Sequence, residues 1–432
     1  MNGHPWWMWI LAAVGVFAIC GVVISLFSSV GRRPVRIWAR EPPPVDSGEF
    51  MLSLSGNING PLRHGGGARL LNNGIEIVPA LLEAIRGARE SVNFAVYIWE
   101  DGEMSDLILD AMLERRREGV AVRILLDGLG GMNAPAERME ELRAAGGQVS
   151  TFRPLRFGKL ARFHKRNHRR TIVIDGVLGF TGGAAVGDKW LGAADTPDHW
   201  RDTMVEVTGP LAVSLQSAFC ETWAYASGEL LAGPRFYPPA DQSAPPDVAV
   251  AHHTSVDSAP SNENHPLRLF FMQSFLSARR TLYVATPYFV PAAEMRDAVA
   301  ERARAGVDVR ILLPDEHTDA WPIRLTSHHY YEKLLRAGVR IYEYQPTMMH
   351  TKHVVVDGLW SVVGSANMDI RSMELNHENV LGILDPGFGR EMQETFLQDL
   401  KRAREIRLEE WNRRGVWART KERIAALFAE QY

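Results

Sequence analysis

The chain has 432 residues, a formal net charge of −3 at pH 7, 46% hydrophobic residues and 23% charged residues. These values are ordinary for a globular protein, and the length provides enough core for two domains. The near-neutral charge disfavours a nucleic-acid-binding protein, for which a basic surface is expected. Cys20 and Cys220 are the only cysteines. Because Cys20 lies in an apolar N-terminal run, we expect no structural disulfide and a reducing compartment.

The N-terminal segment contains an apolar, uncharged run from Trp6 to Val30. About 20 helical residues cross a bilayer core, so we expect residues 1–31 to form one transmembrane anchor. No Lys or Arg precedes this run, whereas four arginines follow it, at Arg32, Arg33, Arg36 and Arg40. By the positive-inside rule, this asymmetry places the remainder of the chain in the cytoplasm. A cleavable signal peptide is the alternative, but it would require a basic start and a shorter apolar run.

Two segments rich in turn-forming residues divide the rest of the chain into halves. We expect residues 32–68 and residues 236–265 to be linkers, with repeats over residues 69–235 and 266–432. The second repeat ends in a helical tail from Phe388 onward. That tail is either an amphipathic helix that touches lipid or a helix packed on the body of the protein.

The two halves carry the same order of elements. In each half an apolar strand ends on an aromatic cluster, at Tyr97-Ile98-Trp99 and at Pro287-Tyr288-Phe289. A helix-like stretch then leads to a near-continuous apolar strand, over residues 122–127 and 309–314. Alternating strands and helices indicate an α/β fold in which each repeat has a mostly parallel or mixed sheet flanked by helices.

One short motif also occurs in each half. The first copy is His168-Arg169-Arg170 followed by an apolar run and Asp175, and the second is His350-Thr351-Lys352 followed by an apolar run and Asp357. Seven residues after each aspartate comes a turn of small residues, Gly182–Ala185 in the first half and Gly364–Asn367 in the second. The β-branched residues after each histidine predict a buried strand, on which the histidine and the cation two residues later share a face.

These residue types suit the cleavage and re-formation of a phosphodiester. Fixed cations, here Arg170 and Lys352, stabilise the charge that builds up on the phosphoryl oxygens. One histidine can attack phosphorus and form a phosphohistidine, while the other protonates the leaving alkoxide and deprotonates the next acceptor. We assign catalysis to the two motifs, with His168 and His350 at their centre. No histidine or carboxylate pair has convincing metal-ligand spacing, and we expect neither a metal nor another cofactor.

The two motif aspartates are expected to have a different role. Asp175 and Asp357 lie seven residues after their histidines, and this odd offset on a regular strand turns them to the opposite side. We therefore expect these aspartates to brace the fold rather than to donate protons.

The paired His-x-(Lys/Arg)-x4-Asp motifs resemble the phospholipase D superfamily, and in detail the bacterial cardiolipin synthases. The finer resemblance rests on Arg166–Arg169, His199–Asp202, Ala285–Pro291, Tyr330-Tyr331-Glu332, Tyr342-Glu343-Tyr344, Gly364–Asp369 and Asn376-His377-Glu378. It covers roughly residues 70 to 432, and it implies two repeats packed about a pseudo-dyad with both motifs in one cleft. It also implies that Ser365 and Asn367 donate to phosphate, and that Glu378 holds a motif histidine in its useful tautomer.

The first motif departs from the family pattern at two positions. Arg170 stands where the family has Lys, and Ala185 stands where the family has Asn, so one donor to phosphate is missing. Asp202 is our candidate for orienting His168, by analogy with other histidine–carboxylate pairs. An ordinary loop salt bridge is the alternative for this aspartate.

The resemblance implies a phosphatidyltransferase of the bacterial inner membrane that joins two phosphatidylglycerol molecules into cardiolipin and releases glycerol. It gives His168 the nucleophile's role and His350 the acid/base role, which the sequence itself does not distinguish. The expected partners are phosphatidylglycerol, other anionic phospholipids and the membrane, with no nucleic acid. A phospholipase-type hydrolase, or a transferase with another acceptor, is the main alternative. A nuclease and a non-catalytic scaffold that binds anionic lipid are further alternatives.

Overall fold

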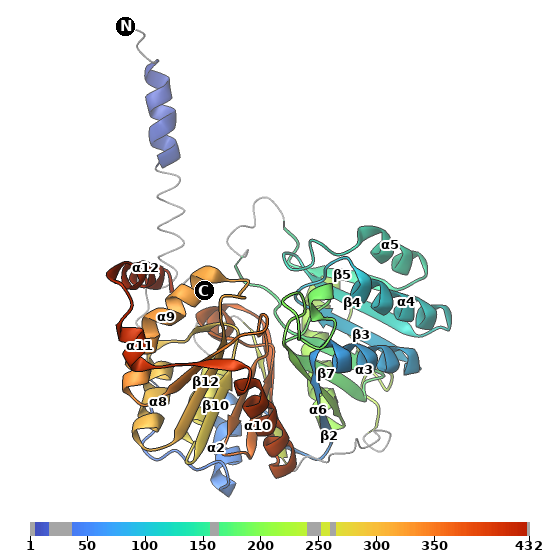
Figure 1. Cartoon of the computed structure of the whole chain (residues 1–432). Coiled ribbons are helices and arrows are strands. Elements are labelled where there is room, and N and C mark those ends of the chain that lie inside the picture. The colour runs from blue at the N-terminus through green and yellow to red at the C-terminus, as the bar shows by residue number, and fades with distance from the viewer. Residues whose placement is uncertain (1–4, 17–36, 156–163, 240–251, 260–264, 430–432) are drawn as a thin grey trace. The chain divides into compact units, whose positions relative to one another are not determined.

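The computed structural model describes residues 5–16, 37–155, 164–239, 252–259 and 265–429 (Figure 1). The chain divides into two compact units, Met1–Ile37 and Trp38–Tyr432. The first unit contains a helix over residues 6–16, and residues 17–30 of the expected transmembrane run lie outside the described part. Within the described ranges, no helix is both long and apolar enough to cross a bilayer.

The first half of the larger unit is built on a seven-stranded mixed sheet with the order β2-β8-β7-β6-β3-β4-β5. Its strands are β2 Gly67–Asn72, β3 Ser91–Val96, β4 Ala121–Asp127, β5 Gln148–Phe152, β6 Thr171–Ile174, β7 Leu178–Gly182 and β8 Thr203–Thr208. Its helices are α3 Asn73–Gly87, α4 Glu103–Arg117, α5 Ala136–Ala144 and α6 Pro210–Ser227. Side chains alternate across β3: Phe94 packs in the same apolar cluster as α3 and α4, whereas Ala95 packs with Phe219 and Trp223 of α6. Helices therefore cover both faces of this sheet (Figure 1).

The second half is built on a nine-stranded mixed sheet with the order β1-β9-β17-β15-β14-β10-β12-β13-β18. Its strands are β1 Arg63–His64, β9 His252–Ser258, β10 Thr281–Ala285, β12 Asp308–Pro314, β13 Arg340–Tyr344, β14 His353–Val356, β15 Trp360–Gly364, β17 Glu378–Leu384 and β18 Ala403–Ile406. A separate pair joins β11 Phe289–Val290 to β16 Met368–Asp369. The helices are α2 Gly48–Ile58, α7 Pro266–Leu276, α8 Ala293–Arg304, α9 Trp321–Arg336, α10 Pro386–Leu400, α11 Leu408–Asn412 and α12 Val416–Ala426.

Seven consecutive strands of the larger sheet repeat the smaller one. The run β9-β17-β15-β14-β10-β12-β13 has the same order and the same pairing directions as β2-β8-β7-β6-β3-β4-β5. This match confirms the prediction of an α/β fold made of two similar repeats.

The sheets are less parallel than the helix–strand alternation indicates. In the smaller sheet, β3, β4 and β5 run parallel, and the other neighbours run antiparallel. The reason is local: β6 and β7 are joined by a three-residue turn, residues 175–177, and so short a connection forces antiparallel pairing. The second repeat has the same hairpin between β14 and β15.

The two repeats share one apolar core. Val173, Val205 and Leu211 of the first repeat belong to the same buried cluster as Val355 and Leu381 of the second. Burial of this kind stabilises by about 25 cal/mol per Å² of apolar surface removed from water. A common core fixes the two sheets relative to each other, and so it fixes the motifs that precede β6 and β14.

Candidate active site

The two motif histidines precede their strands instead of lying on them. β6 begins at Thr171 and β14 at His353, so His168 and His350 stand in extended segments just before the sheet. The expectation that each His-x-cation segment is part of a regular strand is therefore wrong. The physical reason is that both segments pair with the other repeat, through isolated bridges that join Asn167 to His377 and Met349 to Arg201.

This crossed pairing is reciprocal at the backbone. The N–H of His168 donates to the carbonyl of His377 at 2.9 Å, and the N–H of His377 donates to the carbonyl of Arg166 at 2.9 Å. In the other half, the N–H of His350 donates to the carbonyl of Arg201 at 2.7 Å, and the N–H of Arg201 donates to the carbonyl of Met348 at 2.9 Å. Each motif histidine is thus fixed against the segment that opens a strand of the opposite repeat.

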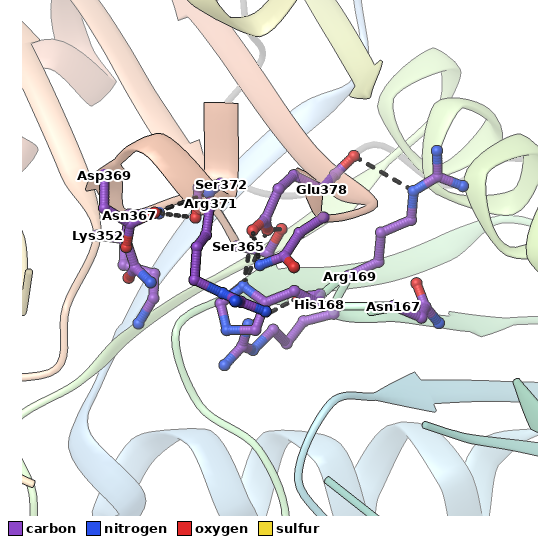
Figure 2. Close-up of polar contacts among 12 residues, drawn as sticks. Asn167, His168, Arg169, Lys352, Ser365, Asn367, Asp369, Arg371, Ser372 and Glu378 are labelled. Atoms are coloured by element: carbon purple, nitrogen blue, oxygen red, sulfur yellow. Dashed lines mark hydrogen bonds and ion pairs between the residues drawn. The ribbon is translucent and has the colours of Figure 1, made fainter. Parts of the chain in front are cut away.

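The side chains of these segments exchange partners in the same way. The Nδ1 atom of His168 lies 2.9 Å and 3.0 Å from the two carboxylate oxygens of Glu378, as Figure 2 shows. The Nδ1 atom of His350 lies 2.8 Å from Oδ2 of Asp202. Our expectation that Asp202 orients His168 is therefore wrong, because the crossing brings this aspartate to His350. A carboxylate on Nδ1 leaves Nε2 as the ring nitrogen available for chemistry.

Both carboxylates are buried and held by further donors. The indole N–H of Trp190 donates to Oδ2 of Asp202 at 2.8 Å, and the N–H of Thr203 donates to Oδ1 at 2.8 Å. The hydroxyl of Ser365 donates to Glu378. Burial opposes ionisation of both groups, yet their histidines and the added hydrogen bonds hold the pKa of Asp202 and of Glu378 below the ordinary values. Both side chains are therefore anionic at neutral pH.

Both histidines are neutral at neutral pH. Burial, and after it the charge of Arg170, lowers the pKa of His168 to about 4. Burial, and after it the charge of Lys352, lowers the pKa of His350 to about 3. A neutral imidazole has a lone pair on its free nitrogen, which an attacking nucleophile needs.

The two cations occupy equivalent positions beside the histidines. Nη1 of Arg170 donates to the carbonyl of His168 at 2.7 Å, and Nζ of Lys352 donates to the carbonyl of His350 at 2.8 Å. Nζ of Lys352 also lies 3.1 Å from Nε2 of His350. Burial lowers the pKa of Arg170, and it lowers the pKa of Lys352 to about 7.

The guanidinium group of Arg170 keeps two N–H donor atoms that no described residue engages. Its Nε and Nη2 atoms are buried and have no hydrogen-bond partner among the described residues. A buried, unpaired guanidinium edge is costly unless an anion meets it, and a phosphate group matches its forked geometry. This edge therefore suits an anionic phosphodiester, and the change from lysine to Arg170 retains the ability to bind one.

The small-residue turns differ between the two halves. In the second turn the hydroxyl of Ser365 lies within hydrogen-bond distance of Glu378 and 3.3 Å from the carbonyl oxygen of Asn379. The backbone N–H of Asn367 donates to Ser372 at 3.1 Å, and the buried side-chain oxygen of Asn367 has no hydrogen-bond partner in the described part of the chain. In the first turn Gly183 takes the place of Ser365, while Ala185 lies within an apolar cluster.

The motif aspartates lie at the far ends of β6 and β14 from the histidines. The carboxylate of Asp175 accepts from the N–H groups of Arg89, Glu90 and Ser91 at 2.7–2.8 Å. The carboxylate of Asp357 accepts from the equivalent N–H groups of residues 279–281 at 2.7–3.0 Å. Each aspartate thus binds the backbone N–H groups at the beginning of the neighbouring strand, β3 or β10, and neither aspartate contacts a motif histidine.

Two buried residues that support the site were missed by the sequence analysis. Arg201 donates through Nε to Asp399 at 2.9 Å and through Nη2 to Asn72 at 2.9 Å, which fixes the segment that carries Asp202. Asn379 accepts from the N–H of Arg170 at 3.0 Å and donates to Thr181 at 2.7 Å, which links the two repeats. Arg201 lies within the His199–Asp202 segment of the resemblance, but no local pattern assigns a role to either residue, because their partners are far away in the sequence. In the described ranges, no group of three or more His, Cys, Asp or Glu side chains is arranged to hold a metal ion.

Comparisons with known proteins agree with this geometry. The family model described as "Cardiolipin synthase, PLD-like domain" matches residues 81–221 and 271–400. Cardiolipin synthase A of Pseudomonas fluorescens is 38% identical over 79% of this chain and 70% of the relative. Cardiolipin synthase 2 of Bacillus anthracis is 34% identical over 81% of this chain and 68% of the relative.

Among solved structures, a phosphatidylserine synthase of Haemophilus influenzae Rd KW20 superposes with a TM-score of 0.67. The superposition covers 89% of this chain and all of that one, at 16% identity, and it supports the fold alone. The family match extends over both repeats and both motifs, and its relatives match most of the chain. The chain therefore belongs to the cardiolipin synthase family of phospholipase D-like proteins.

Proposed function

We propose that this protein is a phosphatidyltransferase that forms cardiolipin from two phosphatidylglycerol molecules and releases glycerol. The observation that carries the proposal is the reciprocal pair of buried histidine–carboxylate contacts, His168 with Glu378 and His350 with Asp202. Two neutral imidazoles with a buried cation beside each supply a nucleophile, an acid/base and charge stabilisation. The names of the related enzymes support cardiolipin as the product.

In the first step, Nε2 of His168 attacks the phosphorus of one phosphatidylglycerol. The phosphodiester anion of the bound lipid raises the pKa of His350, which takes up a proton as the substrate binds. The bond from phosphorus to the headgroup oxygen then breaks, and glycerol leaves with this proton from His350. Arg170 and Lys352 stabilise the charge on the phosphoryl oxygens in the transition state. The products of this step are a phosphatidyl-His168 intermediate and free glycerol.

In the second step, His350 removes the proton from a headgroup hydroxyl of a second phosphatidylglycerol. The resulting oxygen attacks phosphorus, and the bond to His168 breaks, which restores the free histidine. Glu378 stabilises the imidazole of His168 while it carries positive charge in the intermediate, and Asp202 does the same for protonated His350. The two-step route exchanges one phosphodiester for another with no net change of charge.

The same proposal places the enzyme at a membrane. The expected anchor over residues 1–31 would hold the catalytic body on the cytoplasmic side of a bacterial inner membrane. The expected linker over residues 32–68 is not all linker, because Gly48–Ile58 forms α2 and Arg63–His64 forms β1 of that body. The apolar run and the arginines that follow it support this topology. Phosphatidylglycerol and other anionic phospholipids would be the binding partners.

The proposal is tested with purified full-length protein in phosphatidylglycerol vesicles. Products are resolved by mass spectrometry while glycerol release is followed in parallel. Cardiolipin with an equal amount of glycerol is expected from the wild type, and His64→Ala should match it because His64 is exposed on a sheet edge outside the site. His168→Ala and His350→Ala should form none. Phosphatidic acid as the main product would identify a hydrolase instead.

A further inference from the structure

Helix α12 has two faces of opposite character. Glu422 and Ala425 are buried on the face that packs along α9. Nδ1 of His328, in the middle of α9, lies 3.8 Å from Glu422, and Arg414 pairs with the same carboxylate. Of the two alternatives for the C-terminal tail, this packing agrees with a helix that rests on the protein body. The opposite face of the helix is exposed to solvent.

The open face is apolar. Val416 is 82% exposed, Trp417 69% and Leu427 76%, and Ile424 and Phe428 are also exposed. Positions three, four and seven residues apart lie on one side of a helix. Val416, Trp417 and Ile424 of α12 therefore form a stripe, which Leu427 and Phe428 extend in the turn directly after the helix. We call it the α12 stripe. Five exposed apolar side chains along one stripe are unusual on a surface that faces water and are typical of a binding surface.

The exposed charged side chains of α12 are positive. Arg419, Lys421 and Arg423 flank it, and Lys421 and Arg423 are exposed. The ammonium of Lys421 lies 5.7 Å from the ring centre of Trp417. Within residues 416–429, the one acidic residue is Glu422, which is buried and already paired with Arg414. An apolar stripe with basic flanks complements an anionic lipid surface: the apolar side chains enter the acyl boundary while the cations meet headgroup phosphates.

We propose that the α12 stripe docks on the surface of an anionic phospholipid bilayer and so holds the protein body at the headgroups from which the substrate is drawn. The proposal rests on the proposed function for the identity of the lipid substrate. The docking itself depends only on the stripe and its flanking cations. It is separate from the expected N-terminal anchor, which would tether the protein without orienting its body.

The docking is tested on the full-length protein with a polarity-sensitive fluorophore. The label is placed at Leu427→Cys in a Cys20→Ser background, where Cys220 is buried and stays unlabelled. Leu52→Cys is the matched control, since Leu52 on α2 is also exposed, at 66%. After reconstitution in phosphatidylcholine vesicles with phosphatidylglycerol, the emission of the label at 427 should shift to the blue and be quenched by brominated lipid.

The control label at position 52 should stay in water. Equal, water-like emission from both labels in these vesicles overturns the proposal. Shielding of the label at 427 in lipid-free detergent that grows with protein concentration also overturns it, because a second copy of the chain would then cover the stripe.

A kinetic test separates failure of docking from failure of the proposed function. The double substitution Trp417→Glu and Leu427→Glu should raise KM for phosphatidylglycerol in vesicles by about tenfold or more, since two apolar side chains lose their burial. It should leave activity on dissolved short-chain phosphatidylglycerol unchanged within about twofold. An equal loss of activity on vesicles and on the dissolved lipid, or no rise in KM on vesicles, overturns the docking proposal. An inactive wild type refutes the proposed function, while the fluorescence experiment still reports on docking.

Discussion

His168 and Glu378 are 210 residues apart in the sequence, yet the ring Nδ1 of the first lies 2.9 Å from a carboxylate oxygen of the second. His350 and Asp202, 148 residues apart, form the matching contact at 2.8 Å. Each half of the chain therefore contributes a histidine and the carboxylate that orients the other half's histidine. Neither half contains a complete acid, base and orienting group by itself, and this explains why the catalytic centre needs both repeats.

The two carboxylates should affect different steps when they are neutralised. Asp202→Asn removes the charge that stabilises protonated His350, so kcat should fall by about 10²–10⁴-fold with natural phosphatidylglycerol. A lipid with a nitrophenol leaving group needs no proton in the first step, so its first turnover should be nearly normal in this variant. Glu378→Gln acts on His168 and should slow the first turnover with both lipids. Stopped-flow release of nitrophenol measures the rate of the first turnover. Identical rates in the two variants would contradict the assignment of Asp202 to the acid/base histidine and of Glu378 to the nucleophile.

Binding of an anionic headgroup should raise the pKa of His350. In the free site this pKa is about 3 because of burial and Lys352, whereas a phosphodiester anion close by favours the protonated ring. Deacylated phosphatidylglycerol should therefore bind with proton uptake at about pH 6. Calorimetry in buffers of different ionisation enthalpy measures the uptake, with His168→Ala used to prevent turnover. Uptake should disappear when His350→Ala is added, and equal uptake in both proteins would exclude His350 as the acceptor of the proton.

The protein should lose stability as the pH falls below about 6.5, the ordinary histidine pKa. Burial lowers the pKa of His168 and His253 to about 4 and of His350, His353 and His377 to about 3. In this window the unfolded chain binds protons that the folded chain does not, so the free energy of unfolding decreases with falling pH. Each histidine contributes about 1.4 kcal/mol of loss for one pH unit.

Thermal unfolding followed between neutral pH and about pH 5 measures this effect. Removal of one such histidine should make the melting temperature depend less steeply on pH. His353→Gln is suitable because His353 belongs to neither histidine–carboxylate pair of the site. A melting temperature that does not change over this window would show that the histidines are already protonated in the folded protein.

Gly183 should tolerate no side chain. A Cβ atom there would lie 2.0 Å from Oδ1 of Asp202 and 2.8 Å from the carbonyl oxygen of His350. Gly183→Ala should therefore displace Asp202 and lower kcat by about 10–100-fold, as loss of an orienting contact does at other sites. Gly56→Ala is the matched control, because a Cβ atom there meets nothing within 4 Å. Full activity of Gly183→Ala would mean that Asp202 does not need its observed position.

The sequence allowed prediction of the features that repeat locally. Two copies of one motif, each with its cation and its following apolar strand, indicated a two-repeat α/β fold, and the odd offset of Asp175 and Asp357 agrees with their position away from the histidines. The partners of His168 and His350 could not be predicted, because they depend on how two sheets meet through a shared apolar core. The resemblance identified Glu378 as an orienting residue, and analogy with other histidine–carboxylate pairs suggested Asp202 for His168, but the crossing of the two repeats brings Asp202 to His350. The mixed sheets were harder to anticipate because the short turn between β6 and β7 carries no helix.

The central claim, that His168 becomes covalently bound to the lipid while His350 transfers protons, is tested most directly by a burst experiment. Purified wild-type protein, His168→Ala and His350→Ala are mixed with phosphatidyl-nitrophenol, and nitrophenol release and the intact protein mass are measured together. We predict that His350→Ala releases one nitrophenol per protein and retains a phosphatidyl group on His168, because its second step lacks a base. His168→Ala should release none. A burst in His168→Ala with the adduct on His350, or turnover without any adduct, would contradict this account.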